Sequence, residues 1–199
     1  MASGHRSLSG PCGGTAYGDV MEIRGFEPSD AQAVGRVDTG TIVDSIAVIS
    51  GEPRSFTWTA RPLAAAKKKG HDVGAYLQQE PRPWSRAVVA VRQSRIVGFA
   101  AFGLQQWNRR LILWHMYVDH AARRLGVGKA LLEAAIDDPL AQDARHIWLE
   151  TQDDNVPAIA AYEHLGFELV GIDTSLYSDA PDGDIAVFMR RTLQPSSAT

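Results

Sequence analysis

The segment from residue 111 to residue 135 constrains the fold more than any other part of the chain. A β-rich run over 111–118 leads through a short glycine-containing turn into apolar residues at the i, i+3, i+4, i+7 and i+8 spacing of one buried helix face. This face comprises Val127, Ala130, Leu131, Ala134 and Ala135. Because a strand that turns directly into a helix points free N–H groups and the positive end of the helix dipole at one place, the turn is a candidate anion site.

The turn itself reads Arg123-Arg124-Leu125-Gly126-Val127-Gly128 and is followed by Lys129 and Ala130. Its glycines would let a phosphate approach the backbone, and its basic side chains would add charge. A P-loop would need Gly at position 123 and Ser or Thr at position 130, and a dinucleotide fingerprint starting at Gly126 would need Gly or Ala at position 131. The residue types exclude both motifs, whereas an ordinary strand-to-helix turn stays an alternative.

Strand and helix signals on both sides of this segment predict a mixed α/β chain. A helix is predicted after Ser29 or Asp30 as N-cap, and another between Asn155 as N-cap and Gly166 just past its end. The pattern gives no assignment over most of 39–83, apart from two strand-like runs around a turn at 51–53. The remaining strands are expected at 22–26, 86–91, 96–103, 111–118, 146–150, 167–171 and 185–189.

Composition limits the organisation and the partners of the chain. A length of 199 residues, 45% of them hydrophobic, suits one domain, assigned to 21–193, with a Gly/Ser-rich disordered tail at 1–20 and a flexible end at 194–199. The net charge of -3 gives no electrostatic footprint for nucleic acid, and the run 67–69 is interpreted as solvated surface. Cys12 is the only cysteine and the histidines lack ligand spacing, so no metal is assigned. With no apolar run of about 20 residues and no secretory signal, we expect a soluble, cytoplasmic protein without membrane contact.

Two motifs in the right order carry a family resemblance. Met116-Tyr117-Val118-Asp119 followed by Arg-x-x-Gly-x-Gly resembles the coenzyme-A-binding segment of the GCN5-related N-acetyltransferase (GNAT) superfamily, and residues 155–167 resemble its second signature. The resemblance implies a mixed α/β fold of the α+β type: a central six- to seven-stranded, mostly antiparallel sheet with a splayed parallel pair, flanked by helices. It also implies acetyl-CoA as acyl donor.

The resemblance also implies a set of cofactor-binding residues. The pantetheine arm would lie between the strands 111–118 and 146–150, bonded by the backbone near Tyr117 and Val118. The pyrophosphate would be held by the amides of 124–130, supported by Arg123. Positions matching those that line the cofactor are Asn155 and Ala158. The complete predicted set is Tyr117, Val118, Arg123, Arg124, Leu125, Gly126, Val127, Gly128, Lys129, Ala130, Asn155, Ala158 and Tyr162.

Acetyl transfer from a thioester to an amine makes chemical demands that name catalytic candidates. The amine must lose a proton, since a lysine-like nucleophile has a pKa near 10.4, and the departing thiolate benefits from an acid. Tyr162, which the resemblance places beside the thioester sulfur, is the candidate acid, with a core tyrosine as the alternative. Glu150 and His115 are both candidates for the base.

A closer resemblance, over about 84–191, is to the streptothricin acetyltransferases, which acetylate a β-lysine amine and so confer antibiotic resistance. It implies a small cationic acceptor that meets carboxylates, with Trp107, Asn108, Glu150 and Asp173 as candidate substrate-binding residues. Asp179 and Asp182 are interpreted rather as turn formers. A homodimer is considered. Transfer to another small amine or a peptide, and a non-catalytic acyl-CoA-binding module, stay as alternatives.

Overall fold

The computed structural model describes residues 20–52, 55–177 and 184–193. The predictions for the two ends of the chain, for Cys12 and for Asp179 and Asp182 lie outside these ranges. None of the helices within them has the length and apolar composition of a membrane span.

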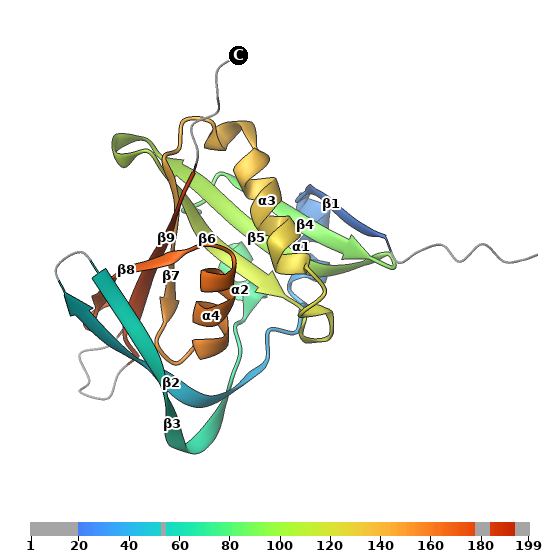
Figure 1. Ribbon diagram of the computed structural model, residues 1–199. Helices are drawn as coiled ribbons and strands as arrows, with labels where there is room; N and C mark the ends of the chain where they lie inside the picture. Colours follow the sequence, from blue (N-terminus) through green and yellow to red (C-terminus); the bar gives the residue numbers. More distant parts are fainter. Residues whose placement is uncertain (1–19, 53–54, 178–183, 194–199) are drawn as a thin grey trace, which may run out of the picture.

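Seven strands form one mixed sheet in the order β1-β4-β5-β6-β7-β9-β8 (Figure 1). Only the central neighbours β6 and β7 run parallel, and every other pair is antiparallel. The predicted mostly antiparallel sheet with one parallel pair is therefore confirmed. The strands are β1 Met21–Gly25, β4 Arg86–Arg92, β5 Arg95–Gln105, β6 Arg110–Val118, β7 His146–Gln152, β8 Glu168–Asp173 and β9 Ala186–Thr192.

Helices cover both faces of this sheet. The longer helices α3 (Val127–Asp137) and α4 (Val156–His164) lie on the face turned to the viewer in Figure 1, while the short helices α1 (Ala31–Val34) and α2 (Val73–Gln78) lie behind it. Short 3-10 turns complete the list: Pro28–Asp30, Gln106–Asn108, His120–Ala122 and Pro139–Ala141.

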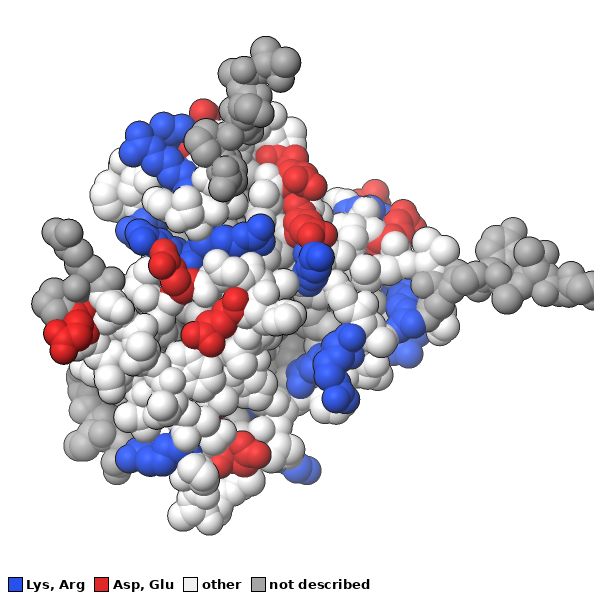
Figure 2. Space-filling view, viewed as in Figure 1, with Lys and Arg blue, Asp and Glu red and all other residues white. Residues whose placement is uncertain are grey.

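Strand alternation divides the buried side chains into two cores. Along β5, Ala100 and Phe102 join the larger core with α3 and α4, whereas Phe99 and Ala101 join a smaller core with α1 and α2. Successive side chains of a strand point to opposite faces, so residues on β6 and β7 can likewise be assigned to the α3/α4 face or to the α2 face. On the α3/α4 face Figure 2 shows interspersed acidic and basic side chains around a broad uncharged area.

A separate two-stranded hairpin, β2 (Thr41–Glu52) and β3 (Ser55–Lys69), packs beside α4 and the end of β7 (Figure 1). It confirms the strand-like runs at 46–49 and 56–58, and extends far beyond them. Trp58 Nε1 donates to Glu163 Oε1 on α4 at 2.8 Å, and the Ala47 amide donates to the Asp153 carbonyl at 2.8 Å. These bonds tie the hairpin to α4 and to the residue that follows β7.

The predicted first helix is much shorter than its pattern suggested, and Asp30 stands at the predicted N-cap position without making a capping bond. The Asp30 carboxylate does not bond the first turn of α1, since it accepts from the Glu27 amide at 2.9 Å and from both terminal nitrogens of Arg24. The helix ends at Val34 because Gly35 follows, packed so closely on α2 that an added Cβ would lie 3.4 Å from Gly74 Cα.

The interpretation of residues 67–69 as solvated surface is wrong for Lys69, whose side chain is 19% exposed, and incomplete for Lys67, which is 51% exposed but ion-paired. Lys67 and Lys69 point to one side of β3, where both pair with Asp154 and Asp184; Lys67 Nζ lies 2.9 Å from Asp154 Oδ2. Only Lys68 points away to solvent. Asp154 is 1% exposed, so its charge requires such partners. These ion pairs attach the end of the hairpin to the segments that flank β7 and β9.

Candidate active site

The parallel strands β6 and β7 pair over only three residues and then separate. Their register runs from Arg110↔His146 to Ile112↔Trp148 and stops. Beyond that point β6 continues beside β5, with a bulge opposite Ala101 and Phe102, and β7 continues beside β9. The bulge re-aims β6 away from its neighbour, so the predicted splayed pair is confirmed.

Free backbone donors gather at the N-terminus of α3, next to the end of β6. Gly126 adopts the left-handed conformation, with φ of 81°, and no side chain caps the helix. None of the amides from Arg124 to Lys129 donates to an acceptor within the described ranges. The Ala130 amide is excluded from the predicted donor set, because it donates to the Gly126 carbonyl at 3.0 Å.

The space and charge around these amides fit the diphosphate of a coenzyme A ester. A Cβ added at Gly126 would meet no atom within 4 Å, and one at Gly128 would meet only Val118 and Met116 at 3.8 and 4.0 Å. Arg124 and Lys129 are exposed and can add positive charge. Consecutive free N–H groups at a helix N-terminus bind anions well.

Arg123 takes a different position from the one its motif suggested. Its guanidinium donates to the Thr39 carbonyl at 2.9 Å and to the Val118 carbonyl at 3.4 Å. The side chain therefore ties the turn to the segment before β2, and supports the shape of the donor site through the backbone.

Glu150 lies on β7 just beyond the point of separation. Its side chain is half-buried and faces away from the core residue Leu149, toward the α2 face. Burial raises the pKa of this carboxyl, while a hydrogen bond from the Tyr177 hydroxyl and the charge of Lys69 lower it. Within the described ranges Glu150 has no ion-pair partner.

Tyr162 lies on α4, on the other face of the sheet, packed against the larger core. Its ring packs edge-on against Phe167, with centroids 5.5 Å apart. Burial, and next the charge of Glu150, raise the pKa of the Tyr162 phenol, so this hydroxyl lies within electrostatic reach of the carboxylate. Asn155 and Ala158 are half-buried at the start of the same helix, where the Asn155 side chain donates to Thr151 Oγ1 at 3.4 Å rather than capping the helix.

His115 and Tyr117 share the α2 face of β6. The Tyr117 hydroxyl lies 3.3 Å from His115 Nδ1, and His115 Nε2 is buried without a hydrogen-bond partner. Burial, and next the neighbouring His71, lower the pKa of His115 to about 4. The imidazole is therefore neutral near pH 7.

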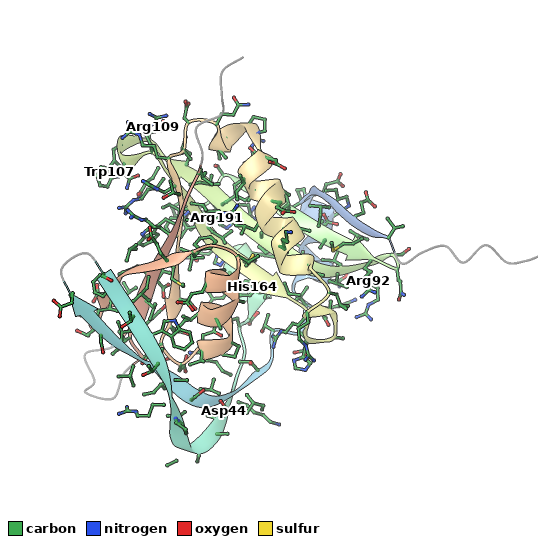
Figure 3. The ribbon with its side chains drawn as sticks, viewed as in Figure 1. Asp44, Arg92, Trp107, Arg109, His164 and Arg191 are labelled. Carbon is green, nitrogen blue, oxygen red and sulfur yellow. The ribbon has the colours of Figure 1, made fainter. Side chains whose placement is uncertain are left out.

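The structure does not bring Trp107 and Asn108 to this opening. They form the turn between β5 and β6, at the closed end of the parallel pair, where Trp107 is 83% exposed (Figure 3). From that end β7 runs four more residues to Glu150, roughly 13 Å at the rise of a strand. Asp173 ends β8, and its carboxylate accepts from the Ser175 amide and hydroxyl, both at 2.7 Å.

Sequence reasoning missed Tyr177, Tyr76 and the two lysines of β3. Tyr177 lies in a segment with a recognised resemblance, but nothing in its spacing indicates that it reaches Glu150. Tyr76 lies on α2, in a stretch without a clear periodic pattern. Within the described ranges no three His, Cys, Asp or Glu side chains are arranged to hold a metal ion.

Comparisons with known proteins agree with this geometry. The sequence profile of the acetyltransferase (GNAT) family matches residues 51–167. Streptothricin acetyltransferase of Streptomyces lavendulae is 30% identical over 182 residues, which cover 88% of this chain and 96% of that protein. The [ribosomal protein bS18]-alanine N-acetyltransferase of Escherichia coli K12 is 33% identical over 54% of this chain and 79% of its own.

Two solved structures share the fold over nearly their whole length. A crystal structure of nourseothricin acetyltransferase superposes with a TM-score of 0.71 at 32% identity, covering 86% of this chain and 98% of its own. A structure from Bacillus anthracis, described as a streptothricin acetyltransferase in complex with acetyl coenzyme A, gives a TM-score of 0.77 at 25% identity, covering 87% and 100%. With its split parallel pair and free α3 amides, the chain belongs to the GNAT family of N-acetyltransferases and uses acetyl-CoA as acyl donor.

Proposed function

We propose that the protein N-acetylates a small cationic acceptor, the β-lysine amine of streptothricin-type antibiotics, and thereby confers resistance in the cytoplasm. Relatives named for streptothricin and nourseothricin align over most of this chain, which supports an acceptor of that class. The observation that carries the proposal is the end of the β6–β7 pairing just before Glu150, with Tyr162 on the helix α4 that covers the other face of the sheet.

Glu150 is the proposed base. A half-buried carboxylate without an ion-pair partner attracts an ammonium group, and its raised pKa increases its affinity for the proton that the amine must lose. His115 competes poorly for this role. The pKa of His115 is about 4, whereas that of Glu150 is raised above the usual carboxyl value, so Glu150 is the stronger base. The Nδ1 atom of His115 also already faces the Tyr117 hydroxyl.

Tyr162 is the proposed donor to the leaving sulfur. Because burial and the Glu150 charge hold its pKa above the ordinary value, the phenol stays protonated throughout the neutral range. A cysteine-like thiol has a pKa near 8.5, below that of the phenol, so complete proton transfer from the phenol to the leaving thiolate is uphill. Tyr162 therefore stabilises the leaving group by a hydrogen bond rather than by releasing its proton.

Acetyl-CoA supplies the activated acetyl thioester, and the residues that hold it are proposed from this geometry. The amides from Arg124 to Lys129 bind the pyrophosphate, with the exposed Arg124 adding charge. The edge of β6 that no longer pairs with β7, near Tyr117 and Val118, orients the pantetheine arm, and Asn155 and Ala158 on α4 line its other side.

Thiol release measured against a panel of amines tests the proposed function. The panel contains streptothricin, a polyamine, an aminoglycoside and a peptide with an N-terminal alanine, and mass spectrometry identifies each acetylated product. We expect kcat/KM for streptothricin to exceed that for every other acceptor by at least tenfold. Preference for another amine would refute streptothricin as the acceptor but not the proposed N-acetyl transfer. Acetyl-CoA binding without thiol release would instead support a non-catalytic acyl-CoA-binding module.

A further inference from the structure

Four aromatic rings gather on the α2 face of the sheet. His71 follows β3, Tyr76 lies on α2, and His115 and Tyr117 lie on β6. The Tyr76 centroid is 5.1 Å from that of His115 and 6.3 Å from that of Tyr117, with the two tyrosine planes only 11° apart. His71 is 5.5 Å from Tyr117. We call these four residues the ring cluster.

The ring cluster lies on the same face of the sheet as the Glu150 carboxylate. The charge of Glu150 contributes to raising the pKa of Tyr117, after burial and the neighbouring Tyr76. The Tyr177 hydroxyl donates to Glu150 Oε1 on this face. Rings from α2 and β6 and the carboxylate from β7 therefore lie on the same face of the sheet, opposite α3.

The charges nearby leave this carboxylate available to a ligand. Lys69 is the cation that acts on Glu150, but its Nζ is bonded to Asp154 and lies 3.1 Å from Asp184. Burial lowers the pKa of both His71 and His115, so neither imidazole is cationic near pH 7. The ring cluster thus presents neutral aromatic surface beside one unmatched negative charge.

Aromatic faces and a carboxylate together select for cations. Ring faces carry the negative part of the aromatic quadrupole, and a cation near them gains more where water is partly excluded. Tyr76 is 36% exposed, so one part of its ring remains open to a ligand while another packs on His115. A neutral or anionic group would gain neither the ring contact nor the pairing with Glu150.

We propose that Tyr76, His115 and Tyr117, with Glu150, form a recognition site for an alkylammonium group of the acceptor. Tyr76 is the specificity-determining residue of this site, through its ring rather than its hydroxyl, which has no hydrogen bond within the described ranges. The inference rests on the proposed function for the position of the acceptor, and it adds the chemical group that is recognised.

Titration of the ¹⁵N-labelled protein with n-pentylammonium and with 1-pentanol, followed by NMR without acetyl-CoA, tests the site. The two probes share a chain and differ in charge. We expect the ammonium to bind at least fivefold more tightly than the alcohol, and to shift amides of α2, β6 and β7. Equal affinities, or shifts confined to other parts of the sheet, would overturn the proposal.

Two substitutions separate the ring from the hydroxyl. Tyr76→Leu should weaken n-pentylammonium binding about three- to tenfold, as expected from the loss of a cation–π contact, whereas Tyr76→Phe should change it less than twofold. Equal loss in both variants, or none in Tyr76→Leu, would refute the role of the ring. Unchanged acetyl-CoA affinity and thermal unfolding show that Tyr76→Leu is folded.

The binding test is independent of acetyl transfer. If the ammonium binds as expected but no amine is acetylated, the proposed function fails and the recognition site stands. If streptothricin is acetylated but Tyr76→Leu leaves both its KM and n-pentylammonium affinity unchanged, the recognition site fails and the proposed function stands.

Discussion

Substituting Tyr177 by Phe should move the acidic limb of the pH–rate profile to higher pH. The Tyr177 hydroxyl donates to Glu150 Oε1, and this bond opposes the effect of burial on the Glu150 pKa. The phenylalanine ring keeps the shape of the side chain and removes only the donor. The Glu150 pKa should therefore rise, and the carboxylate should become protonated at a higher pH than in the parent.

The size of the shift follows from the bond that is lost. A hydrogen bond to a charged group contributes about 1.5–3 kcal/mol, and water can replace part of it here because Tyr177 is 39% exposed. A remaining loss of about 1 kcal/mol corresponds to somewhat less than one pH unit. Below the limb, where the rate depends on the ionised fraction of the base, the variant should be about three- to tenfold slower.

The assay is kcat/KM for the acceptor from pH 5 to pH 9 at saturating acetyl-CoA. On the high-pH plateau Tyr177→Phe should stay within about threefold of the parent, since Glu150 is ionised in both. An acidic limb that stays in place, or that moves to lower pH, would show that Glu150 is not the group that titrates. A uniform loss at every pH would indicate that Tyr177 contacts the acceptor instead.

Three other substitutions probe the donor side and the framework. Tyr162→Phe should lower kcat about 10²- to 10³-fold, the usual cost of a lost transition-state donor, with little change in acetyl-CoA affinity by calorimetry; unchanged turnover would remove the donor role. Gly98→Ala places a Cβ 2.8 and 2.9 Å from two α3 side chains, so chemical denaturation should show about 1–3 kcal/mol lower stability. Asp154→Asn should lower the free energy of unfolding by about 2–3 kcal/mol at pH 7. This is less than the usual cost of breaking a fully buried ion pair, because the side chain of Lys67 is 51% exposed. Since the lysines outweigh burial and lower the Asp154 pKa, this difference should be complete above about pH 4 and shrink as pH falls further; a constant difference would contradict the ion-pair role.

The parts of the fold that depend on local pattern could be predicted from the sequence. The apolar residues of α3 recur with the period of a helix, and Gly126 marks a turn that needs a positive φ. Both features can be recognised without tertiary information. Asp30 stands at the predicted N-cap position but makes no capping bond, because its carboxylate is held by Arg24 on β1. Local signals cannot show such a competition.

The candidate site likewise contains residues that the local pattern indicates and residues that only tertiary packing makes important. Glu150 and Tyr162 lie in segments with clear patterns, so the strand and the helix that carry them could be predicted. Tyr76 and Lys69 could not be found, because their importance arises only when α2 and the end of β3 pack against β6 and β7. Lys69 also shows why a charge run is ambiguous, since strand alternation turns Lys68 to solvent and its two neighbours to the buried Asp154 and the partly exposed Asp184.

On the proposed assignment, the sheet separates the two substrates by charge. The α3 N-terminus places free amides and the positive end of a helix dipole on one face, where they suit the anionic part of acetyl-CoA. The carboxylate of Glu150 and the ring cluster lie on the opposite face, where they suit an ammonium. Each site repels the partner of the other, so the substrates can meet only through the opening between β6 and β7. Because that opening exists only where the parallel pairing stops, and the pantetheine arm is proposed to lie in it, closing it by extending the β6–β7 register should abolish transfer and weaken acetyl-CoA binding, which calorimetry would measure.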